Sequence, residues 1–202
     1  IWNANASREF LNSRKLWHLD EDDLGPIYGH QWRHYNASYY NNKTNYDGRG
    51  VDQLENVVTM LKNEKERESR RIILNAWNPC QIDEMALPPC HVLSQFIVKN
   101  NELTTILYQR SGDIGLGIPF NIASYSFLTH ILAKHCDIEA KELVHIIGDA
   151  HIYEDHIDPL KEQIKKKLYD FPEIEIIKKC ESIDDYNMDH VKVNNYIYRK
   201  KI

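Results

Sequence analysis

The stretch CHVLSQFIVKNNELTTILYQ (Cys90–Gln109) decides the fold. Its two halves are rich in β-branched and aromatic residues, which are typical of strands. Between them lie Lys99, Asn100 and Asn101, three residues that favour a turn. The pattern predicts that the two halves pair as a hairpin.

Further elements are expected on both sides of this hairpin. The first 47 residues favour irregular structure with short elements. Helical spacing of apolar residues predicts helices at VDQLENVVTMLKN (51–63), NIASYSFLTHILAKHCD (121–137, largely buried) and DHIDPLKEQIKKKL (155–168). Strands are expected at RRIILNAW (70–77), ELVHIIGD (142–149), EIEII (173–177) and VKVNNYIY (191–198). Runs of strands with few helices between them predict the α+β fold class.

Composition and charge argue against several classes of protein. With 202 residues, 42% hydrophobic and 27% charged, the chain can bury a core and is expected to form a single domain over residues 1–202. The 25 Lys and Arg against 30 Asp and Glu give a net charge of −5, so the chain has no overall positive charge that would attract nucleic acid. No apolar run approaches the roughly 20 residues of a membrane span, so no membrane association is expected.

The cysteines and histidines predict neither a disulfide scaffold nor a metal site. Four cysteines are too few for such a scaffold at this length, and their spacing is not that of a zinc site. A reducing compartment, and hence a cytoplasmic location, is expected. His130 and His135 are five residues apart and do not share a helix face, and His151 and His156 straddle a predicted boundary, so no metal is expected.

Cys90 is the first candidate for chemistry. Pro88 and Pro89 lack N–H groups and have fixed φ angles, so they give the thiol a stiff, pre-set position at the entrance to a strand. That position suits a nucleophile, and it also suits a buried cysteine acting as a small hydrophobic side chain. His91 is not expected to form a dyad with Cys90, because successive strand side chains point to opposite faces.

Two segments carry residues suited to phosphate. After the hairpin, Arg110 offers a fork of donors beside Ser111 and Gly112, although a tight turn with an ion-paired arginine fits the same pattern. Arg70 and Arg71 form either a second phosphate grip or a solvated pair at a strand entrance.

Three more polar residues have two interpretations each. Asn121 lies near the expected start of the long helix, where a cap is the simplest role. His151 and Tyr153 are two residues apart and would share a face if the chain is extended there. Together they would bind sugar hydroxyls or satisfy hydrogen bonds in the core.

Five segments, in order, closely resemble thymidylate synthase, and the resemblance runs through essentially the whole chain. They are DLGPIYGHQWRH (23–34), SRRIILNAWN (69–78), MALPPCH (85–91), LYQRSGDIGLGIPFNIASY (107–125) and GDAHIYEDHIDPLK (148–161). The resemblance implies a large mixed sheet flanked by helices and an obligate homodimer, packed sheet to sheet, with shared active sites. It also implies conversion of dUMP and 5,10-methylenetetrahydrofolate into dTMP and dihydrofolate. The folate would be the cosubstrate that supplies both the one-carbon unit and the reductant.

The resemblance also implies a role for each candidate residue. Cys90 matches the nucleophile that adds to carbon 6 of uracil, and Arg110 would favour the thiolate while holding the substrate phosphate. Tyr28 matches a tyrosine implicated in proton removal from carbon 5. Asn121 matches the residue that reads the uracil edge, where the related dCMP hydroxymethylases have Asp.

The implied binding residues form two sets. Those for dUMP are Arg70, Arg71, Arg110, Ser111, Gly112, Asp113, Asn121, His151 and Tyr153, of which Arg70 and Arg71 would reach the phosphate held by the other subunit. Those for folate are Asp113, Leu116, Gly117 and Phe120.

The chain departs from the family pattern at both ends. Residues before Ile1 should include an arginine loop and a glutamate, and the chain stops at Lys201-Ile202, short of the family's C-terminal tail. Residues 1–202 are therefore expected to lack these parts and to be a weak catalyst or none. A dihydrofolate reductase, fused or separate, is the implied partner. Two alternatives stay open: a dUMP hydroxymethylase, and a catalytically silent member acting as a binding subunit.

Overall fold

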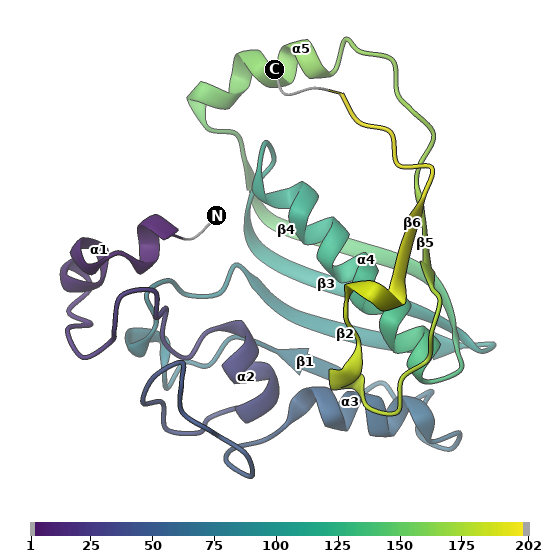
Figure 1. The fold of residues 1–202 in the computed structure, drawn as a ribbon, viewed down its shortest axis with the longest axis horizontal. Coiled ribbons are helices and arrows are strands. Elements are labelled where there is room, and N and C mark those ends of the chain that lie inside the picture. Colours follow the sequence, from purple (N-terminus) through teal and green to yellow (C-terminus); the bar gives the residue numbers. More distant parts are fainter. Residues whose placement is uncertain (1–2, 200–202) are drawn as a thin grey trace.

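A four-stranded mixed sheet forms the centre of the fold (Figure 1). The computed structural model describes residues 3–199. Both ends of the chain, residues 1–2 and 200–202, lie outside the described residues, and so do the predictions made for Ile1 and for Lys201-Ile202. The strands, in sheet order, are β1 (Ile73–Asn75), β2 (His91–Lys99), β3 (Glu102–Asp113) and β4 (Glu139–His151). β1, β2 and β3 are antiparallel neighbours, whereas β3 and β4 are parallel. The predicted mixed sheet and α+β class are confirmed.

The predicted hairpin consists of β2 and β3. Lys99 pairs with Glu102, and the two turn residues Asn100 and Asn101 have φ angles of 54° and 61°. Positive φ at both positions gives the turn a twist that matches the paired strands, and Asn tolerates this conformation. β3 continues through Asp113, so the alternative of a tight turn at Arg110 to Gly112 is wrong; the turn begins only after Asp113.

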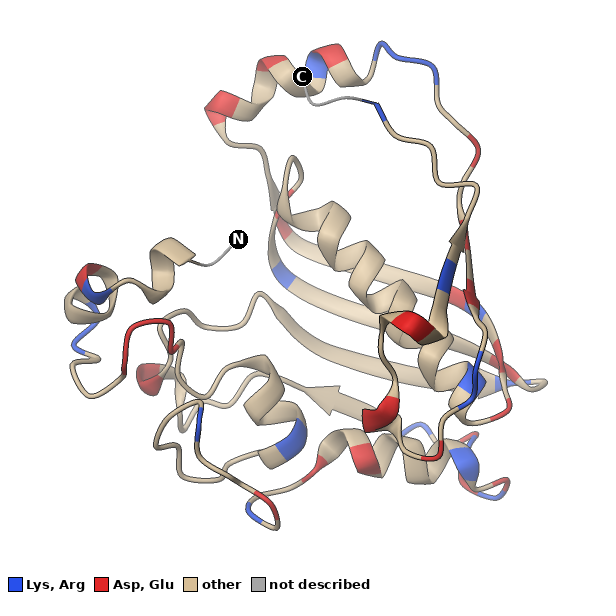
Figure 2. Cartoon of the chain, viewed as in Figure 1, with Lys and Arg blue, Asp and Glu red and all other residues tan. Residues whose placement is uncertain are grey.

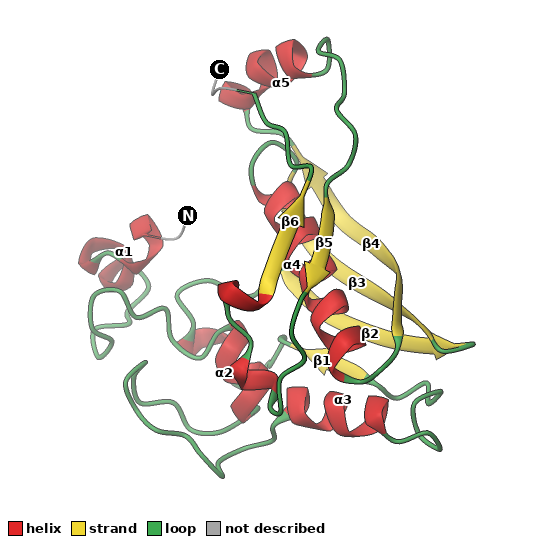
Figure 3. Ribbon diagram, turned by 45° about the vertical axis from the view of Figure 1, so that its right-hand side comes forward, coloured by secondary structure: helices red, strands yellow, loops and turns green. Residues whose placement is uncertain are grey.

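Two helices cover one face of the sheet (Figure 3): α3 (Gln53–Lys62) and α4 (Gly117–His135). α3 begins where the Asp52 carboxylate accepts the Glu55 N–H at 2.9 Å. α4 begins four residues earlier than predicted. The main core lies between these helices and the sheet and includes Val57, Leu61, Ile72, Leu74, Phe96, Leu103 and Leu132.

The remaining elements are short. The other α-helices are α1 (Arg8–Ser13), α2 (Tyr28–His34) and α5 (Ile157–Gln163), and β5 (Glu173–Ile176) pairs with β6 (Val191–Asn194) as a separate antiparallel sheet beside α4. The 3-10 helices are η1 (Asn3–Ala6), η2 (Ile82–Glu84), η3 (Glu154–His156), η4 (Ile183–Asp185) and η5 (Met188–His190). The helix predicted over 155–168 and the strands predicted over 70–77 and 191–198 are thus shorter than expected.

The sheet face opposite α4 is apolar and uncovered within residues 3–199. Strand alternation places Ile73, Ile97, Tyr108 and Ile146 there, each 39 to 48% exposed, and we call these four residues the open sheet face. Figure 2 shows few charged residues along the middle of these strands. Exposed apolar side chains gathered on one face of a sheet are typical of an interface. No helix in the described part of the chain is long and apolar enough to cross a membrane.

Gly50 is required by a close backbone approach. Its φ is +66°, and an added Cβ would lie 2.6 Å from the carbonyl oxygens of His34 and Tyr35. Gly48 has a similar φ of +72°, but a Cβ added there would have no other atom within 4 Å. We therefore expect Gly50→Ala to lower the free energy of unfolding by about 3 kcal/mol, and Gly48→Ala by about 1 kcal/mol. Urea unfolding of both variants measures the difference, and equal losses would contradict the steric argument.

Candidate active site

Cys90 is held by its backbone at the entrance to β2. Its N–H donates to the phenol oxygen of Tyr28 at 2.9 Å, and its carbonyl accepts the N–H of Arg110 at 2.9 Å. The residue is half-buried, whereas Cys136 and Cys180 are buried. Cys90 is therefore less enclosed than the alternative of a buried, hydrophobic cysteine expects.

Arg110 lies beside this thiol. Its Nε donates to the Pro89 carbonyl at 2.9 Å, and its Nη2 donates to the Pro88 carbonyl at 3.0 Å. The same Nη2 lies 3.9 Å from Cys90 Sγ, and the guanidinium carbon lies 5.7 Å from the centre of the Trp77 ring. Because carbonyl oxygens hold the guanidinium without neutralising it, its charge is available to an anion.

Tyr28 and His91 form an uncharged pair next to Cys90. Their rings stack with centroids 3.9 Å apart, and His91 Nδ1 lies 2.7 Å from the Tyr125 hydroxyl. Burial raises the pKa of Tyr28 to about 12, and burial together with neighbouring His145 lowers the pKa of His91 to about 4. Both side chains are neutral near pH 7, and the expectation that His91 forms no dyad with Cys90 agrees with its partners.

Asn121 faces a buried amide rather than capping its helix. It is the fifth residue of α4, so the predicted capping role is wrong. Its Oδ1 accepts from Gln109 Nε2 at 3.0 Å, and Gln109 Oε1 lies 2.9 Å from His145 Nε2. Neither Gln109 nor His145 was predicted as a site residue. The available signal was a glutamine two residues after Leu107, on the inward-facing alternation of β3.

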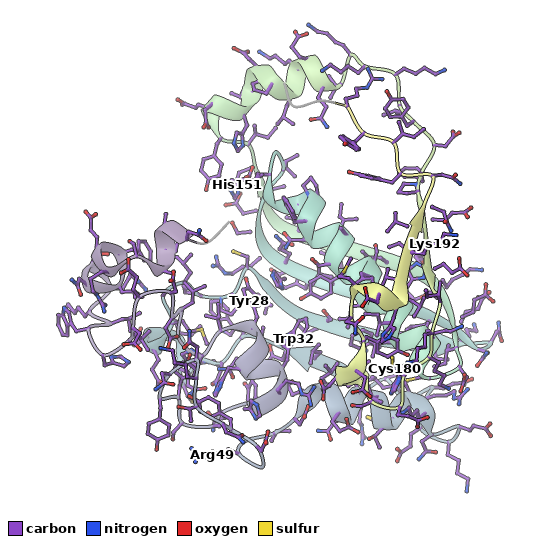
Figure 4. All side chains as sticks on the ribbon, viewed as in Figure 1. Tyr28, Trp32, Arg49, His151, Cys180 and Lys192 are labelled. Carbon is purple, nitrogen blue, oxygen red and sulfur yellow. The ribbon has the colours of Figure 1, made fainter. Side chains whose placement is uncertain are left out.

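The carboxyl ends of β3 and β4 bring three predicted residues together. Asp113 pairs with His151 in the parallel register, and the His151 ring lies 5.3 Å from that of Tyr153, almost perpendicular to it. The predicted shared face of His151 and Tyr153 is thus confirmed. Figure 4 shows His151 and Tyr28 at the same end of the sheet. Ser111 and Gly112 lie between Arg110 and this edge as part of β3.

The start of α4 contributes an apolar rim to the same edge. The Asp113 carboxylate accepts the Gly115 N–H at 3.0 Å, which ends the strand in a turn and leads into α4 at Gly117. Leu116 and Phe120 are 48% and 54% exposed there. An acidic acceptor thus lies beside two accessible apolar side chains.

Arg70 and Arg71 are not brought to Cys90 within one chain. Both are exposed just before β1, where Ile73 pairs with Gln95, five residues along β2 from Cys90. At roughly 3.3 Å per strand residue, that separation is about 16 Å. The two guanidinium groups are therefore accessible to another molecule.

Metal ligands are not clustered in the part of the chain that the structure describes: no group of three or more His, Cys, Asp or Glu side chains there could hold a metal ion.

Comparison with known proteins assigns the family. The sequence profile of the thymidylate synthase family matches residues 1–202. Thymidylate synthase of Ascaris suum is 52% identical over 196 residues (97% of this chain, 66% of that protein), and that of Homo sapiens is 48% identical over 196 residues (97% and 62%). The bifunctional dihydrofolate reductase-thymidylate synthase of Plasmodium berghei is 48% identical over 202 residues, which are 100% of this chain and 34% of that protein. The chain spans about two thirds of the single-function relatives and about one third of the bifunctional one. With its whole length matched, the chain belongs to the thymidylate synthase family.

Proposed function

We propose that this protein catalyses the reductive methylation of dUMP to dTMP, with 5,10-methylenetetrahydrofolate as cosubstrate and dihydrofolate as the second product. The observation that carries the proposal is the placement of the Cys90 thiol 3.9 Å from the Arg110 guanidinium, with the Tyr28 hydroxyl bonded to the Cys90 N–H. A nucleophile, an anion-binding charge and a proton-carrying hydroxyl thus surround one position. The names of the relatives support the same reaction.

In this proposal Cys90 supplies the covalent step. Its thiolate forms a bond from Sγ to carbon 6 of the uracil ring, and the electron pair of the ring double bond moves toward carbon 5 and the adjacent carbonyl. Arg110 attracts the thiolate electrostatically and offers its remaining donors to the nucleotide phosphate. One cation therefore serves both nucleophile and substrate.

The base and the ribose are assigned to other side chains. Asn121 donates from Nδ2 to a ring carbonyl and accepts the ring N–H at Oδ1, which suits uracil. Tyr28 keeps its proton near pH 7, so its hydroxyl acts as a neutral relay when the proton leaves carbon 5. His151 and Tyr153 form the pair for the ribose hydroxyl, and Ser111 and the Gly112 backbone complete the phosphate site.

The folate is assigned to the edge formed by Asp113, Leu116, Gly117 and Phe120. The residues fit such a molecule. The accessible Leu116 and Phe120 side chains suit the face of a flat aromatic ring, and the Asp113 carboxylate can accept N–H groups from the edge of that ring. When bound, the folate supplies the one-carbon unit and the hydride. Gly117 presents no side chain toward Asp113, so the approach to this carboxylate is not obstructed there.

The partners are assigned from the surface of the sheet. A second copy of the chain would cover the open sheet face as an obligate homodimer, and Arg70 and Arg71 would then reach the phosphate held by the other copy. A reductase that regenerates the folate would act with it, either fused, as in the bifunctional relatives, or separate. A reducing, cytoplasmic compartment agrees with four free thiols.

Trapping with 5-fluoro-dUMP tests the proposed activity. The fluorine at carbon 5 blocks proton removal, so incubation with this nucleotide and methylenetetrahydrofolate is expected to leave one nucleotide and one folate attached per active site. Intact-mass measurement detects the adduct, and product mass with dUMP distinguishes dTMP from a hydroxymethyl product. Protein that binds dUMP but forms neither adduct nor dTMP would contradict the enzyme assignment and favour a silent binding subunit.

A further inference from the structure

The amide of Gln109 is held by three neighbours in one orientation. Its Nε2 donates to the Ser111 carbonyl at 2.9 Å and to Asn121 Oδ1 at 3.0 Å, and its Oε1 lies 2.9 Å from His145 Nε2. The Ser111 carbonyl can only accept, so it determines which end of the amide is the nitrogen. Oε1 must then face His145, and His145 Nε2 must carry a hydrogen to pair with it. Because Gln109 is only 2% exposed, water does not replace a missing partner.

We propose that His145 is a positioning residue that secures the preference for uracil over cytosine, an inference that rests on the proposed function. His145 donates to Gln109, and Gln109 donates to Asn121 Oδ1. Asn121 is thereby left with Oδ1 for a ring N–H and Nδ2 for a ring carbonyl, which is the pattern of uracil. The reversed amide would offer a donor to a bare ring nitrogen and an acceptor to an amino group, which is the pattern of cytosine.

The first test reads the proton on His145 without any nucleotide. Burial lowers the pKa of His145, so the ring is neutral at pH 7.5. Long-range ¹H–¹⁵N spectra of histidine-labelled protein, with His145→Gln used to assign the signals, are expected to show the hydrogen on Nε2 and none on Nδ1. The opposite tautomer would overturn the proposal, because a bare Nε2 cannot donate to Gln109.

The second test compares two substitutions. His145→Leu removes the donor, and His145→Gln keeps an N–H at a similar distance along the side chain. Leu143→Ala, on the same face of β4, is the control for lost packing. Calorimetric binding of dUMP and dCMP gives the ratio of their Kd values. We expect the preference for dUMP, measured as Kd for dCMP divided by Kd for dUMP, to fall about tenfold in His145→Leu and to stay near the parent value in the other two variants.

Each outcome distinguishes this inference from the proposed function. A parent protein that prefers dUMP, with the same preference in His145→Leu, overturns the role of His145 and leaves the proposed function intact. A parent protein with no preference for dUMP overturns both. If His145 had a purely structural role, its loss would weaken the binding of both nucleotides equally and leave the ratio of their Kd values unchanged. If His145→Leu does not fold, the tautomer of His145 still decides the question.

Discussion

Replacing Cys90 with Ala is expected to lower the rate of dTMP formation by roughly 10⁴-fold or more, since the reaction then has no nucleophile. The nucleotide phosphate and base contacts do not involve Sγ. The affinity for dUMP is therefore expected to remain measurable in the variant. Turnover is measured by dTMP formation, the 5-fluoro-dUMP adduct by intact mass, and dUMP binding by calorimetry.

Cys80→Ala is the matched control for this change. Cys80 is an exposed free thiol outside the Cys90, Arg110 and Tyr28 arrangement, so its removal is expected to leave turnover and adduct formation unchanged. If Cys90→Ala retained comparable turnover, the covalent mechanism would be wrong. If the adduct disappeared in the Cys80 variant instead, the nucleophile would have been assigned to the wrong residue.

Subunit complementation is expected to produce the second large effect. Arg70 and Arg71 precede Ile73, whose partner Gln95 already lies about 16 Å along β2 from Cys90 of the same chain, so in the proposed dimer they serve the other chain's site. A double Arg70→Ala, Arg71→Ala protein and a Cys90→Ala protein are each expected to be nearly inactive. A fully exchanged equal mixture contains about half heterodimers with one intact site each, so roughly a quarter of wild-type activity is expected to return.

The same two proteins mixed without subunit exchange provide the control, and they should stay inactive. Exchange is verified by native mass spectrometry with one partner isotopically labelled. Heterodimers that form without recovery of activity would show that the arginines act in their own subunit or not at all. A monomeric protein with full activity would refute shared sites directly.

Much of the fold was predictable because local patterns and tertiary packing agree. Asn100 and Asn101 favour the positive φ angles of a hairpin turn, and the β-branched runs beside them lie in paired strands. Gly112 is an exception, because glycine usually indicates a turn. Here it continues β3, since the side chain of Ile118 from α4 occupies the space that a Cβ would need. Sequence spacing alone does not reveal such a long-range contact.

The candidate site was predictable where its chemistry is local. Cys90 directly follows two prolines, and His151 and Tyr153 are only two residues apart. Gln109 and His145 are 36 residues apart, and they meet because β3 and β4 are parallel neighbours. A parallel pairing across a long helix leaves no short-range signal in the sequence, so their hydrogen bond becomes visible only in three dimensions.

The anchoring of Arg110 by two proline carbonyls has a consequence for substrate association. A free arginine side chain loses up to about 2 kcal/mol of rotational freedom when it is immobilised. Here the main chain of Pro88 and Pro89 restrains the guanidinium in the protein without ligand, so that loss accompanies folding instead of nucleotide capture. Every residue type has a backbone carbonyl. Substitutions at positions 88 and 89 that preserve the local backbone conformation are therefore expected to preserve the orientation of the Arg110 guanidinium.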